Sequence, residues 1–325
     1  MSHAMIIYKT GGPEVLQWEP FDPGQPAPGE ALVRHEAVGL NYIDIYHRSG
    51  LYPLPALPTV PGLEGAGIVE AIGDGVTEVS VGDRVAYAGV PAGAYAEIRR
   101  IPAHRLIRLP EAISTRQAAA MMLQGMTARY LLKKCVPVKK GDTILIHAAA
   151  GGVGLLVCQW ARHLGARVIG TVGSEAKAEL ARANGCDHPI LYDREDFAQR
   201  VRDLTDGVGA NVVYDSVGKA TFMKSLDCLR PMGTLVTFGQ SSGKVPPVDI
   251  GLLGAKGSLF LTRPSLMTYT ARREDLVEHA QDLFDVVTSG KVRLDIGRTW
   301  PLAEAADAHR ALEARQTTGS SLLIP

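Results

Sequence analysis

A glycine-rich turn lies near the middle of the chain. Residues 147–154 read HAAAGGVG; they follow the apolar residues 143–146 and precede the amphipathic residues 155–164. A pyrophosphate needs unobstructed backbone N–H groups and the positive end of a helix dipole. Gly151 and Gly154 stand at the second and third glycine positions of GxGxxG, with an alanine at the first. Because a strand and a helix flank the turn, it predicts dinucleotide binding and indicates a pyridine-nucleotide enzyme.

The residues after the second strand of this region indicate which nucleotide binds. An NAD site usually has an acid at the end of that strand, about 20 residues after the glycine turn. No Asp or Glu closes the strand at residues 167–172. Gly173 and Ser174 leave room for a 2′-phosphate at a helix start, and Lys177 supplies a cation. We expect Tyr192, at the end of the third strand, to cover that phosphate or the adenine, so NADPH is favoured over NADH.

Two alternatives to this cofactor interpretation stay open. Lys177 is also explained as a solvated helix residue, because surface lysines are common. Glu175 is the second alternative, since its carboxylate is suited to bind a ribose hydroxyl instead.

Composition and charge limit the class of protein. The chain has 325 residues, of which 46% are hydrophobic and 21% charged, as is ordinary for a two-domain globular protein. Its 34 acidic residues balance 34 Lys and Arg, so no overall field favours nucleic acid or an anionic membrane. No apolar run approaches the ~20 residues of a membrane span and no signal pattern opens the sequence, so we expect a cytoplasmic protein. The four cysteines form no CxxC pair and are expected to be free thiols.

Two kinds of periodicity divide the chain. Up to residue 115, short alternating runs such as 31–35 and 67–72 predict antiparallel strands. One long helix is predicted at 116–133. Strands then alternate with helices, at 143–146, 167–172, 188–192, 211–215, 234–238 and 258–262. This alternation is typical of an α/β, doubly wound parallel sheet.

The C-terminal part of the chain has a different pattern. Two amphipathic stretches, at 272–287 and 302–314, precede a final apolar strand at 321–324. We expect this tail to return to the first, mostly β domain.

Seven segments together resemble a known family. They are GLNYID at 39–44, RSGLYP at 48–53, GDRV at 82–85, the turn at 148–154, YDSVG at 214–218, RPS at 263–265 and GSSLLIP at 319–325. Through them the whole chain is similar to the medium-chain dehydrogenase/reductases, and among these to the zinc-independent NADPH:quinone oxidoreductases related to zeta-crystallin.

The resemblance implies a domain organisation and an assembly. It implies a GroES-like, mostly β catalytic domain at residues 1–125 and a Rossmann NADPH-binding domain at 126–267. Residues 268–325 would then form a C-terminal segment that returns to the catalytic domain. Members of this family are usually homodimers, so we expect a homodimer.

The chain departs from the zinc alcohol dehydrogenases of the same superfamily at two ligand positions. Asn41 stands where they have their first cysteine ligand, and Leu63 replaces the histidine of their Gly-His-Glu motif. No cysteine precedes Cys135, so their four-cysteine structural lobe is missing as well. Because a tetrahedral zinc site needs such ligands, we expect no metal.

A site without a metal favours particular substrates. Alcohol and aldehyde interconversion passes through an alkoxide-like oxygen, which normally requires a Lewis acid or a strong proton donor. Hydride delivery to a quinone instead gives a delocalised phenolate-type anion, comparable to tyrosinate with a pKa of about 10. We therefore expect NADPH-dependent reduction of quinones to hydroquinones or semiquinones, through proximity and orientation alone.

The resemblance places the catalytic residues at the mouth between the domains, near the nicotinamide. Asn41 is expected to hydrogen-bond a ribose hydroxyl or the substrate oxygen. Tyr46 and Tyr52 are expected to form flat walls with polar tips. Arg263 is expected to polarise a developing oxyanion.

The expected cofactor contacts lie mainly on loops at the carboxyl ends of parallel strands, where open sheets bind ligands. They are Asn41, Tyr42, Asp44, Thr127, Gly151, Gly152, Val153, Gly154, Gly173, Ser174, Lys177, Tyr192, Ser216, Val217, Phe238, Gly239, Gln240, Ser241, Arg263 and Arg315.

Several of these and neighbouring residues have structural alternatives. Asp44 is also suited to cap a helix, Arg48 to pair with an acid, and Tyr52 to lie in the core. Arg315 is equally suited to a helix C-terminus, where the dipole favours a cation. His147 precedes the phosphate turn, so we interpret it as a hydrogen-bonded strand-end residue rather than a proton shuttle.

Two other functions stay open. An enzyme of the same architecture can reduce enones or enoyl thioesters, because they too take a hydride from NADPH and form a delocalised anion. The sizes of Tyr46, Tyr52 and Leu266 do not separate these substrates. A structural or RNA-binding role, known for zeta-crystallin relatives, is disfavoured by the zero net charge and the lack of an RNA-binding motif.

Overall fold

The computed structural model describes residues 2–325, which form two compact units. The first unit runs up to Met126 and also contains residues 269–288 and 294–325. The second unit contains residues 127–268 and 289–293. Each unit has its own sheet and its own hydrophobic core.

The second unit is built on a six-stranded parallel sheet with the strand order β10-β9-β8-β11-β12-β13. This is the Rossmann order, in which the chain starts at the sheet centre and adds strands first on one side and then on the other. The strands are β8 (Thr143–Ile146), β9 (Arg167–Val172), β10 (His188–Leu191), β11 (Ala210–Asp215), β12 (Leu229–Thr237) and β13 (Phe260–Thr262). The doubly wound sheet predicted from the strand-helix alternation is therefore confirmed.

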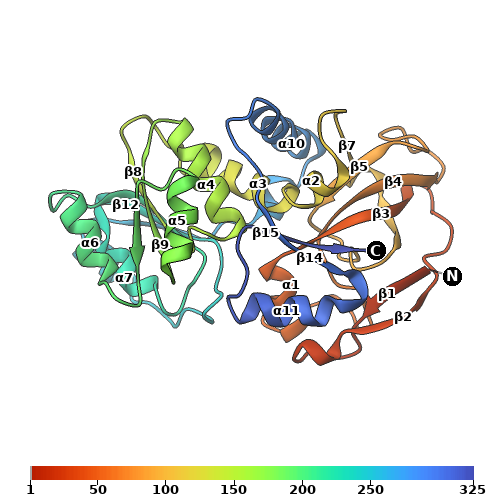
Figure 1. The fold of residues 1–325 in the computed structure, drawn as a ribbon, viewed down its shortest axis with the longest axis horizontal. Helices are drawn as coiled ribbons and strands as arrows, with labels where there is room; N and C mark the ends of the chain where they lie inside the picture. The colour runs from red at the N-terminus through yellow and green to blue at the C-terminus, as the bar shows by residue number, and fades with distance from the viewer. Residues whose placement is uncertain (1) are drawn as a thin grey trace. The chain divides into compact units, whose positions relative to one another are not determined.

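Helices cover both faces of this sheet. Figure 1 shows α4 (Gly152–His163) and α5 (Glu175–Ala183) on one face, and α6 (Phe197–Leu204) and α7 (Phe222–Asp227) on the other. Two short helices complete the unit, α8 (Gly251–Ala255) and α9 (Leu266–Tyr269), the second of which extends into the first unit. Buried strand residues such as Leu145, Ile169 and Val213 pack with Phe197 and Phe222 from the helices.

The first unit is mostly β, as predicted. Its seven-stranded sheet has the order β14-β15-β3-β4-β5-β7, and β6 also pairs with β3. The strands are β3 (Glu30–Leu40), β4 (Glu64–Ile72), β5 (Arg84–Ala88), β6 (Ile98–Pro102), β7 (Ile107–Arg108), β14 (Ile296–Pro301) and β15 (Ser320–Ile324). The C-terminal strand β15 pairs antiparallel with β3, with Ser321 opposite Leu40. A separate hairpin pairs β1 (Ser2–Ile6) with β2 (Gln17–Phe21).

Four longer helical segments belong wholly or mainly to the first unit. They are α1 (Tyr42–Ser49), α3 (Met122–Tyr130), α10 (Arg273–Thr288) and α11 (Ala305–Glu313). The short helix α2 (Thr115–Ala119) and the 3₁₀ turns η1 (Pro13–Val15), η2 (Ala103–Arg105) and η4 (Leu302–Glu304) complete it. The core contains Val33, Val38, Tyr87, Trp300 and Leu323.

The single helix predicted at 116–133 is wrong. The structure has α2 and α3, followed by a π-helical turn, η3 (Leu131–Cys135). At the break, the carbonyl of Ala120 accepts a hydrogen bond from Ser320 Oγ (2.7 Å), and the N–H of Leu123 donates to Glu64 Oε1 (2.7 Å). Helix ends leave such backbone groups without helical partners, so side chains from distant strands stabilise the interruption.

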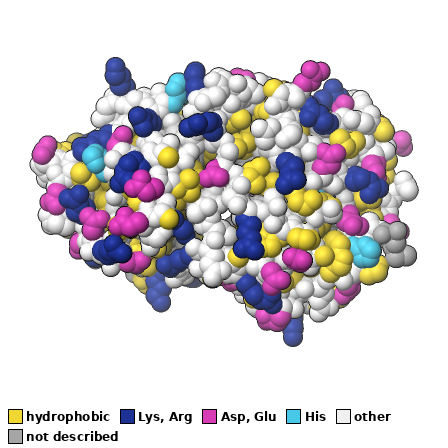
Figure 2. All heavy atoms as spheres, viewed as in Figure 1, with side chains coloured by type: hydrophobic (Ala, Val, Ile, Leu, Met, Phe, Trp, Pro, Cys, Tyr) yellow, Lys and Arg dark blue, Asp and Glu magenta, His cyan; other side chains and the backbone are white. Residues whose placement is uncertain are grey.

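The surface carries both signs of charge. Figure 2 shows Lys and Arg side chains interspersed with Asp and Glu over the face in view. Among residues 2–325, no helix combines the length and the apolar character needed to cross a bilayer.

Candidate active site

The glycine turn joins β8 to α4 as predicted. Helix α4 begins at Gly152 with Gly151 as its N-cap, so the N–H groups of its first turn point out of the helix end. A Cβ added to Gly154 would lie 2.8 Å from both Cα and C of Ala149, which is closer than real contacts allow. A Cβ on Gly151 would meet only the carbonyl oxygen of Ala148, at 3.2 Å. The turn thus needs a glycine at 154 for close helix packing and leaves the backbone near 151 open.

The residues predicted to hold the 2′-phosphate meet at the start of α5. Ser174 is the N-cap of this helix, and its Oγ accepts a hydrogen bond from the N–H of Lys177 (3.3 Å). Tyr192 lies against Gly173, because a Cβ on that glycine would come within 2.6 Å of the tyrosine hydroxyl. The structure therefore brings these four residues together at a helix N-terminus, which is suited to an anion.

The loops after β11 and β12 are packed against each other. Asp215 Oδ1 accepts the N–H of Val217 (2.8 Å), and the N–H of Ser241 donates to the carbonyl of Ser216 (3.2 Å). A Cβ on Gly239 would lie 2.6 Å from that same carbonyl oxygen. These contacts hold the predicted cofactor loops in one arrangement.

Arg263 follows β13 and contacts the loop after β12. Its Nη1 donates to Thr237 Oγ1 (3.1 Å) and lies 3.4 Å from the carbonyl oxygen of Gly239. In the same unit, Gln240 and Thr127 are both buried, while Phe238 is half-buried. The guanidinium is therefore held beside the residues predicted to contact the cofactor.

His147 is a structural residue, as interpreted from its position. It is 1% exposed, and its ring nitrogens contact Thr171 Oγ1 and Ser225 Oγ, each at 2.9 Å. Ser225 in turn donates to Asp215 Oδ2 (3.2 Å). Burial lowers the pKa of His147, so the ring is neutral and links the end of β8 to β9 and α7.

In the first unit, Asn41 begins helix α1. It is the N-cap, and its N–H donates to Asp44 Oδ2 (2.9 Å). Such an acid in the first helical turn satisfies a backbone donor and complements the helix dipole. The helix ends at Gly50, whose φ of 80° lies in the left-handed region that favours glycine. Asp44 therefore does cap the helix.

The side chain of Asn41 belongs to a buried polar chain that the sequence did not reveal. Asn41 Nδ2 donates to Glu64 Oε2 (2.7 Å), and Asn41 Oδ1 accepts from Gln124 Nε2 (3.1 Å). Gln124 Oε1 accepts from Ser320 Oγ (2.7 Å). The only hint of this chain in the sequence was Glu64. The acid of the Gly-His-Glu motif is retained in Gly62-Leu63-Glu64, although leucine replaces the histidine ligand.

A second buried chain runs from Asp44 to Arg48. Tyr95 Oη donates to Asp44 Oδ2 (3.1 Å) and contacts His309 Nε2 (2.9 Å). Arg48 Nη1 lies 3.3 Å from His309 Nδ1. Because a guanidinium only donates, Nδ1 must accept and Nε2 must carry the ring proton, which it donates to Tyr95. Asp44 Oδ1 has no hydrogen-bond partner within residues 2–325.

Burial sets the protonation of these groups. It raises the pKa of Asp44 to about 7 and that of Glu64 to about 8, and the negative charge of Asp44 adds to the rise at Glu64. Burial and the nearby Arg48 lower the pKa of His309 to about 3. The site thus holds two carboxyl groups that exchange protons near neutral pH and a histidine that stays neutral.

Three tyrosines form a row on α1 and the segment after it. The ring centroids of Tyr42 and Tyr46 are 5.4 Å apart, and those of Tyr46 and Tyr52 are 4.9 Å apart. Tyr46 is 6% exposed, whereas Tyr42 and Tyr52 are half-buried. Burial raises the pKa of Tyr42, and the charge of Arg315, which follows helix α11 with a φ of 59°, offsets part of that rise. The three rings therefore pack against one another within the first unit, and their role as walls of a substrate site stays a prediction.

The zinc-ligand positions of the related alcohol dehydrogenases carry no metal-binding group. Leu63 is completely buried, and the amide of Asn41 is bound to Glu64 and Gln124. Throughout residues 2–325, no three His, Cys, Asp or Glu side chains are grouped to hold a metal ion.

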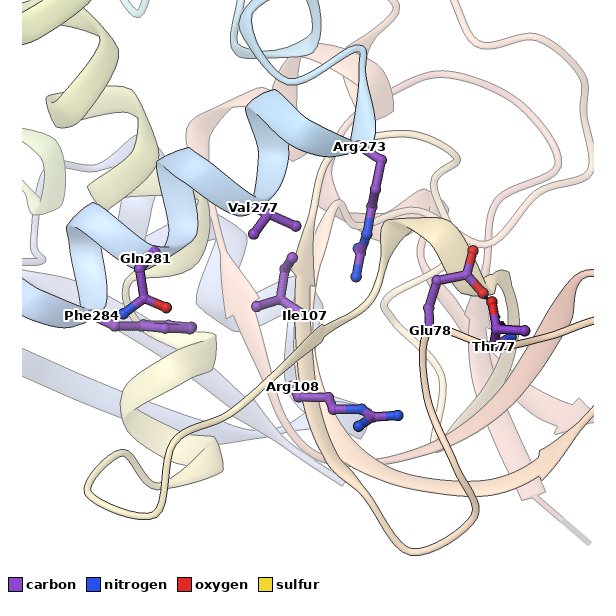
Figure 3. Close-up of a pocket in the computed structure, with 8 residues that line it drawn as sticks. All are labelled: Thr77, Glu78, Ile107, Arg108, Arg273, Val277, Gln281 and Phe284. Atoms are coloured by element: carbon purple, nitrogen blue, oxygen red, sulfur yellow. Dashed lines mark hydrogen bonds between the residues drawn. The ribbon is translucent and has the colours of Figure 1, made fainter.

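A pocket of about 300 Å³ in the first unit lies away from these residues. Figure 3 shows Arg273, Val277, Gln281 and Phe284 of α10 along one side, with Ile107 and Arg108 of β7 opposite. Arg108 pairs with Asp83 (2.9 Å), and Arg273 donates to backbone carbonyls. None of the predicted site residues lines this pocket, so it is not the candidate active site.

Comparisons with known proteins show to which sequences this chain is similar. Residues 152–284 match the family described as zinc-binding dehydrogenase, and residues 27–111 match the alcohol dehydrogenase GroES-like domain. A quinone oxidoreductase of Pseudomonas aeruginosa is 52% identical over 315 residues, which are 97% of each chain. A 2-haloacrylate reductase of a Burkholderia species is 47% identical, over 100% of this chain and 99% of its own.

One solved structure extends the comparison to three dimensions. The crystal structure of Escherichia coli quinone oxidoreductase complexed with NADPH superposes with a TM-score of 0.98 at 49% identity. The match covers 99% of this chain and 100% of that one. The chain therefore belongs to the zinc-independent quinone oxidoreductase family of the medium-chain dehydrogenase/reductases.

Proposed function

We propose that this chain is an NADPH-dependent quinone oxidoreductase that works without a metal. The observation that carries the proposal is the full-length similarity to quinone oxidoreductases, 52% with the Pseudomonas enzyme and 49% with the Escherichia coli enzyme solved with NADPH. NADPH, when bound, supplies the hydride. The residues of this chain bind the dinucleotide, orient the acceptor and exclude water.

The second unit fits the dinucleotide. The open backbone near Gly151 and the dipole of α4 would hold the pyrophosphate, while Gly154 lets the helix pack closely on the turn. Gly173, Ser174, Lys177 and Tyr192 would surround the 2′-phosphate. The remaining proposed cofactor contacts are Thr127, Ser216, Val217, Phe238, Gly239, Gln240, Ser241, Arg263, Asn41, Tyr42 and Arg315, with Asp44 acting through the Asn41 backbone.

We assign the acceptor to four residues. Asn41 would hydrogen-bond the acceptor oxygen or a cofactor ribose, and Tyr46 and Tyr52 would provide flat apolar walls. Arg263 would stabilise negative charge that develops on the acceptor oxygen. A quinone spreads that charge over its ring. The phenolate-type product anion has a conjugate acid with a pKa of about 10, so water suffices to protonate it.

Anaerobic stopped-flow measurements test this proposal. The purified protein is mixed with NADPH and, separately, with benzoquinone, naphthoquinone and an α,β-unsaturated ketone. We expect NADPH oxidation with both quinones and slower oxidation with the ketone. Failure of every quinone alongside turnover of the ketone would contradict quinone reduction and leave cofactor binding intact.

A reductase of α,β-unsaturated carbonyl compounds is the second candidate. The 47% identical 2-haloacrylate reductase favours it, because a haloacrylate is an alkene conjugated to a carboxylate. Adding 2-chloroacrylate to the same assay decides between the two. An RNA-binding role is tested separately by a salt titration of RNA affinity, and binding at low salt would revive that alternative.

We further propose a cytoplasmic homodimer. Strand β13 ends the Rossmann sheet, and its Phe260 and Leu261 are 61% and 40% exposed. An exposed apolar edge strand is suited to pair with a second copy. Sedimentation should give a dimer that Phe260→Asp dissociates and Val208→Asp, at a similarly exposed residue, does not. The cytoplasm fits four free thiols, and cell fractionation tests it.

A further inference from the structure

Four buried side chains in the first unit form one directional hydrogen-bond chain. Ser320, Gln124, Asn41 and Glu64 are 5%, 7%, 5% and 0% exposed. The hydroxyl of Ser320 lies 2.7 Å from both Gln124 Oε1 and the carbonyl oxygen of Ala120, and can donate its one proton to either. The amide of Gln124 donates to Asn41, and the amide of Asn41 donates to Glu64, at 3.1 and 2.7 Å. We call this set the Glu64 chain.

Only one member of the Glu64 chain can set its direction. The two amides have nearly the same shape either way round, and a serine hydroxyl can donate or accept. Above its pKa of about 8, Glu64 is ionised and its carboxylate only accepts, whereas below that pH the carboxyl group keeps a proton that it can also donate. Both Glu64 oxygens accept N–H donors, Oε2 from Asn41 and Oε1 from the backbone of Leu123 at 2.7 Å.

The space around Glu64 holds the carboxylate in place. A Cβ on Gly39 would collide with Glu64 Oε2 and would lie 2.5 Å from the carbonyl oxygen of Ala119. The titratable groups that face Glu64 are Asp44 on α1, Tyr87 on β5 and Tyr95 in the segment before β6. Glu64 is completely buried, and its carboxyl group fits there because residue 39 has no side chain.

We propose that Glu64 is a positioning residue that fixes the orientation of the Asn41 amide, and so decides where Asn41 presents a donor and where it presents an acceptor. This inference rests on the proposed function, in which Asn41 contacts the acceptor or the cofactor ribose. If the amide were reversed, its nitrogen and oxygen would exchange places without any change in shape. A hydrogen bond to the acceptor would then become a contact between two donors or two acceptors.

Two variants separate orientation from stability. Glu64→Gln offers one acceptor to two donors, so while Asn41 keeps its wild-type orientation either Asn41 Nδ2 or the N–H of Leu123 loses its partner. The double variant Glu64→Gln/Gln124→Glu moves the carboxylate to the other side of Asn41. There every hydrogen bond of the chain can form again, but with the Asn41 amide reversed. Glu111→Gln, at an exposed glutamate, controls for the negative charge that Glu64→Gln removes.

The expected results differ for stability and activity. Measured above pH 8, where Glu64 is ionised, Glu64→Gln should lower the thermal midpoint and reduce kcat/KM with quinone by roughly tenfold, the effect of one misplaced buried hydrogen bond. The double variant should regain the thermal midpoint of the wild type but keep the reduced kcat/KM. A double variant that regains both, or a Glu64→Gln variant with wild-type kcat/KM, would overturn the proposal.

A companion variant and a spectroscopic measurement keep the test decisive. If Asn41→Ala has wild-type kcat/KM, the proposed role of Asn41 fails; if Asn41→Ala loses activity and Glu64→Gln does not, only the orientation by Glu64 fails. In the apoprotein, ¹H–¹⁵N spectra should show one Asn41 side-chain proton shifted downfield and protected from solvent. An unshifted, rapidly exchanging amide would contradict the proposal even if no variant folds.

Discussion

Arg48 and Glu313 form a bidentate ion pair that joins helix α1 to helix α11. Arg48 Nη2 lies 2.7 Å from Glu313 Oε1, and Nη1 lies 3.0 Å from Oε2. The arginine side chain is 2% exposed and that of the glutamate 35%. Arg48 Nε also donates to the carbonyl of Gly11 (3.2 Å). The pair therefore anchors the helix whose N-cap is Asn41.

Removing the acid of this pair should destabilise the protein. Glu313→Ala leaves the guanidinium of Arg48 buried without a counter-charge, which we expect to cost about 2 kcal/mol or more of the free energy of unfolding. The matched control is Asp307→Ala on the same helix, whose partner Arg310 is exposed and whose loss should cost less than about 0.5 kcal/mol. Urea unfolding measures both free-energy changes. Equal losses would show that the buried Arg48–Glu313 pair stabilises the protein no more than an exposed pair does.

Local patterns in the sequence predicted the Rossmann unit well. Residues 143–146 and 167–172 are strands β8 and β9 with the predicted bounds, because buried parallel strands are short apolar runs with clear ends. The glycine turn was equally legible, since Gly154 is required by a contact within the same strand-turn-helix unit.

Contacts between distant segments were beyond such patterns. Asn41 was expected to face the substrate, but its bonds to Glu64 and Gln124 join residues 23 and 83 positions away. The interruption between α2 and α3 was missed for the same reason, because Ser320, at the far end of the chain, binds the carbonyl at the break. Periodicity reports which face of a helix is buried, not which side chain ends it.

The phosphate turn should not accept a side chain at 154. In Gly154→Ala, the added Cβ would lie 2.8 Å from backbone atoms of Ala149, so the turn or the helix must shift. We expect a loss of about 1–3 kcal/mol of stability and at least roughly tenfold weaker NADPH binding. Gly254→Ala is the matched control, because nothing lies within 4 Å of its Cβ position in α8. NADPH fluorescence titration and thermal unfolding check both variants. Unchanged NADPH affinity in Gly154→Ala would contradict pyrophosphate binding at this turn.

Lys177 should discriminate between the two nicotinamide cofactors. Glu175, the alternative ligand for a ribose hydroxyl, is paired with Arg194 at 3.2 Å. Lys177→Ala removes a cation from the proposed 2′-phosphate site, so NADPH should bind roughly tenfold more weakly and NADH unchanged. Arg182→Ala, an exposed cation on the same helix α5, should alter neither affinity. Equal losses for both cofactors in Lys177→Ala would place the 2′-phosphate elsewhere.

The buried acids and histidines should give opposite slopes of stability against pH. Burial raises the pKa of Glu64 from 4.5 to about 8, so between these values the folded state keeps a proton that the unfolded state releases, and stability falls as pH rises. His309, lowered from 6.5 to about 3, takes its proton only in the unfolded state between those values, so stability falls as pH drops below 6.5. Thermal midpoints should therefore fall between pH 6.5 and about 8, where only the acids titrate, while between about 4.5 and 6.5 the opposing slopes of the acids and His309 offset each other. Glu64→Gln should flatten the decline above pH 6.5, leaving the part due to Asp44, and should steepen the loss of stability below pH 6.5, because the opposing effect of Glu64 is gone. An unchanged slope above pH 6.5 would mean that Glu64 is ionised throughout.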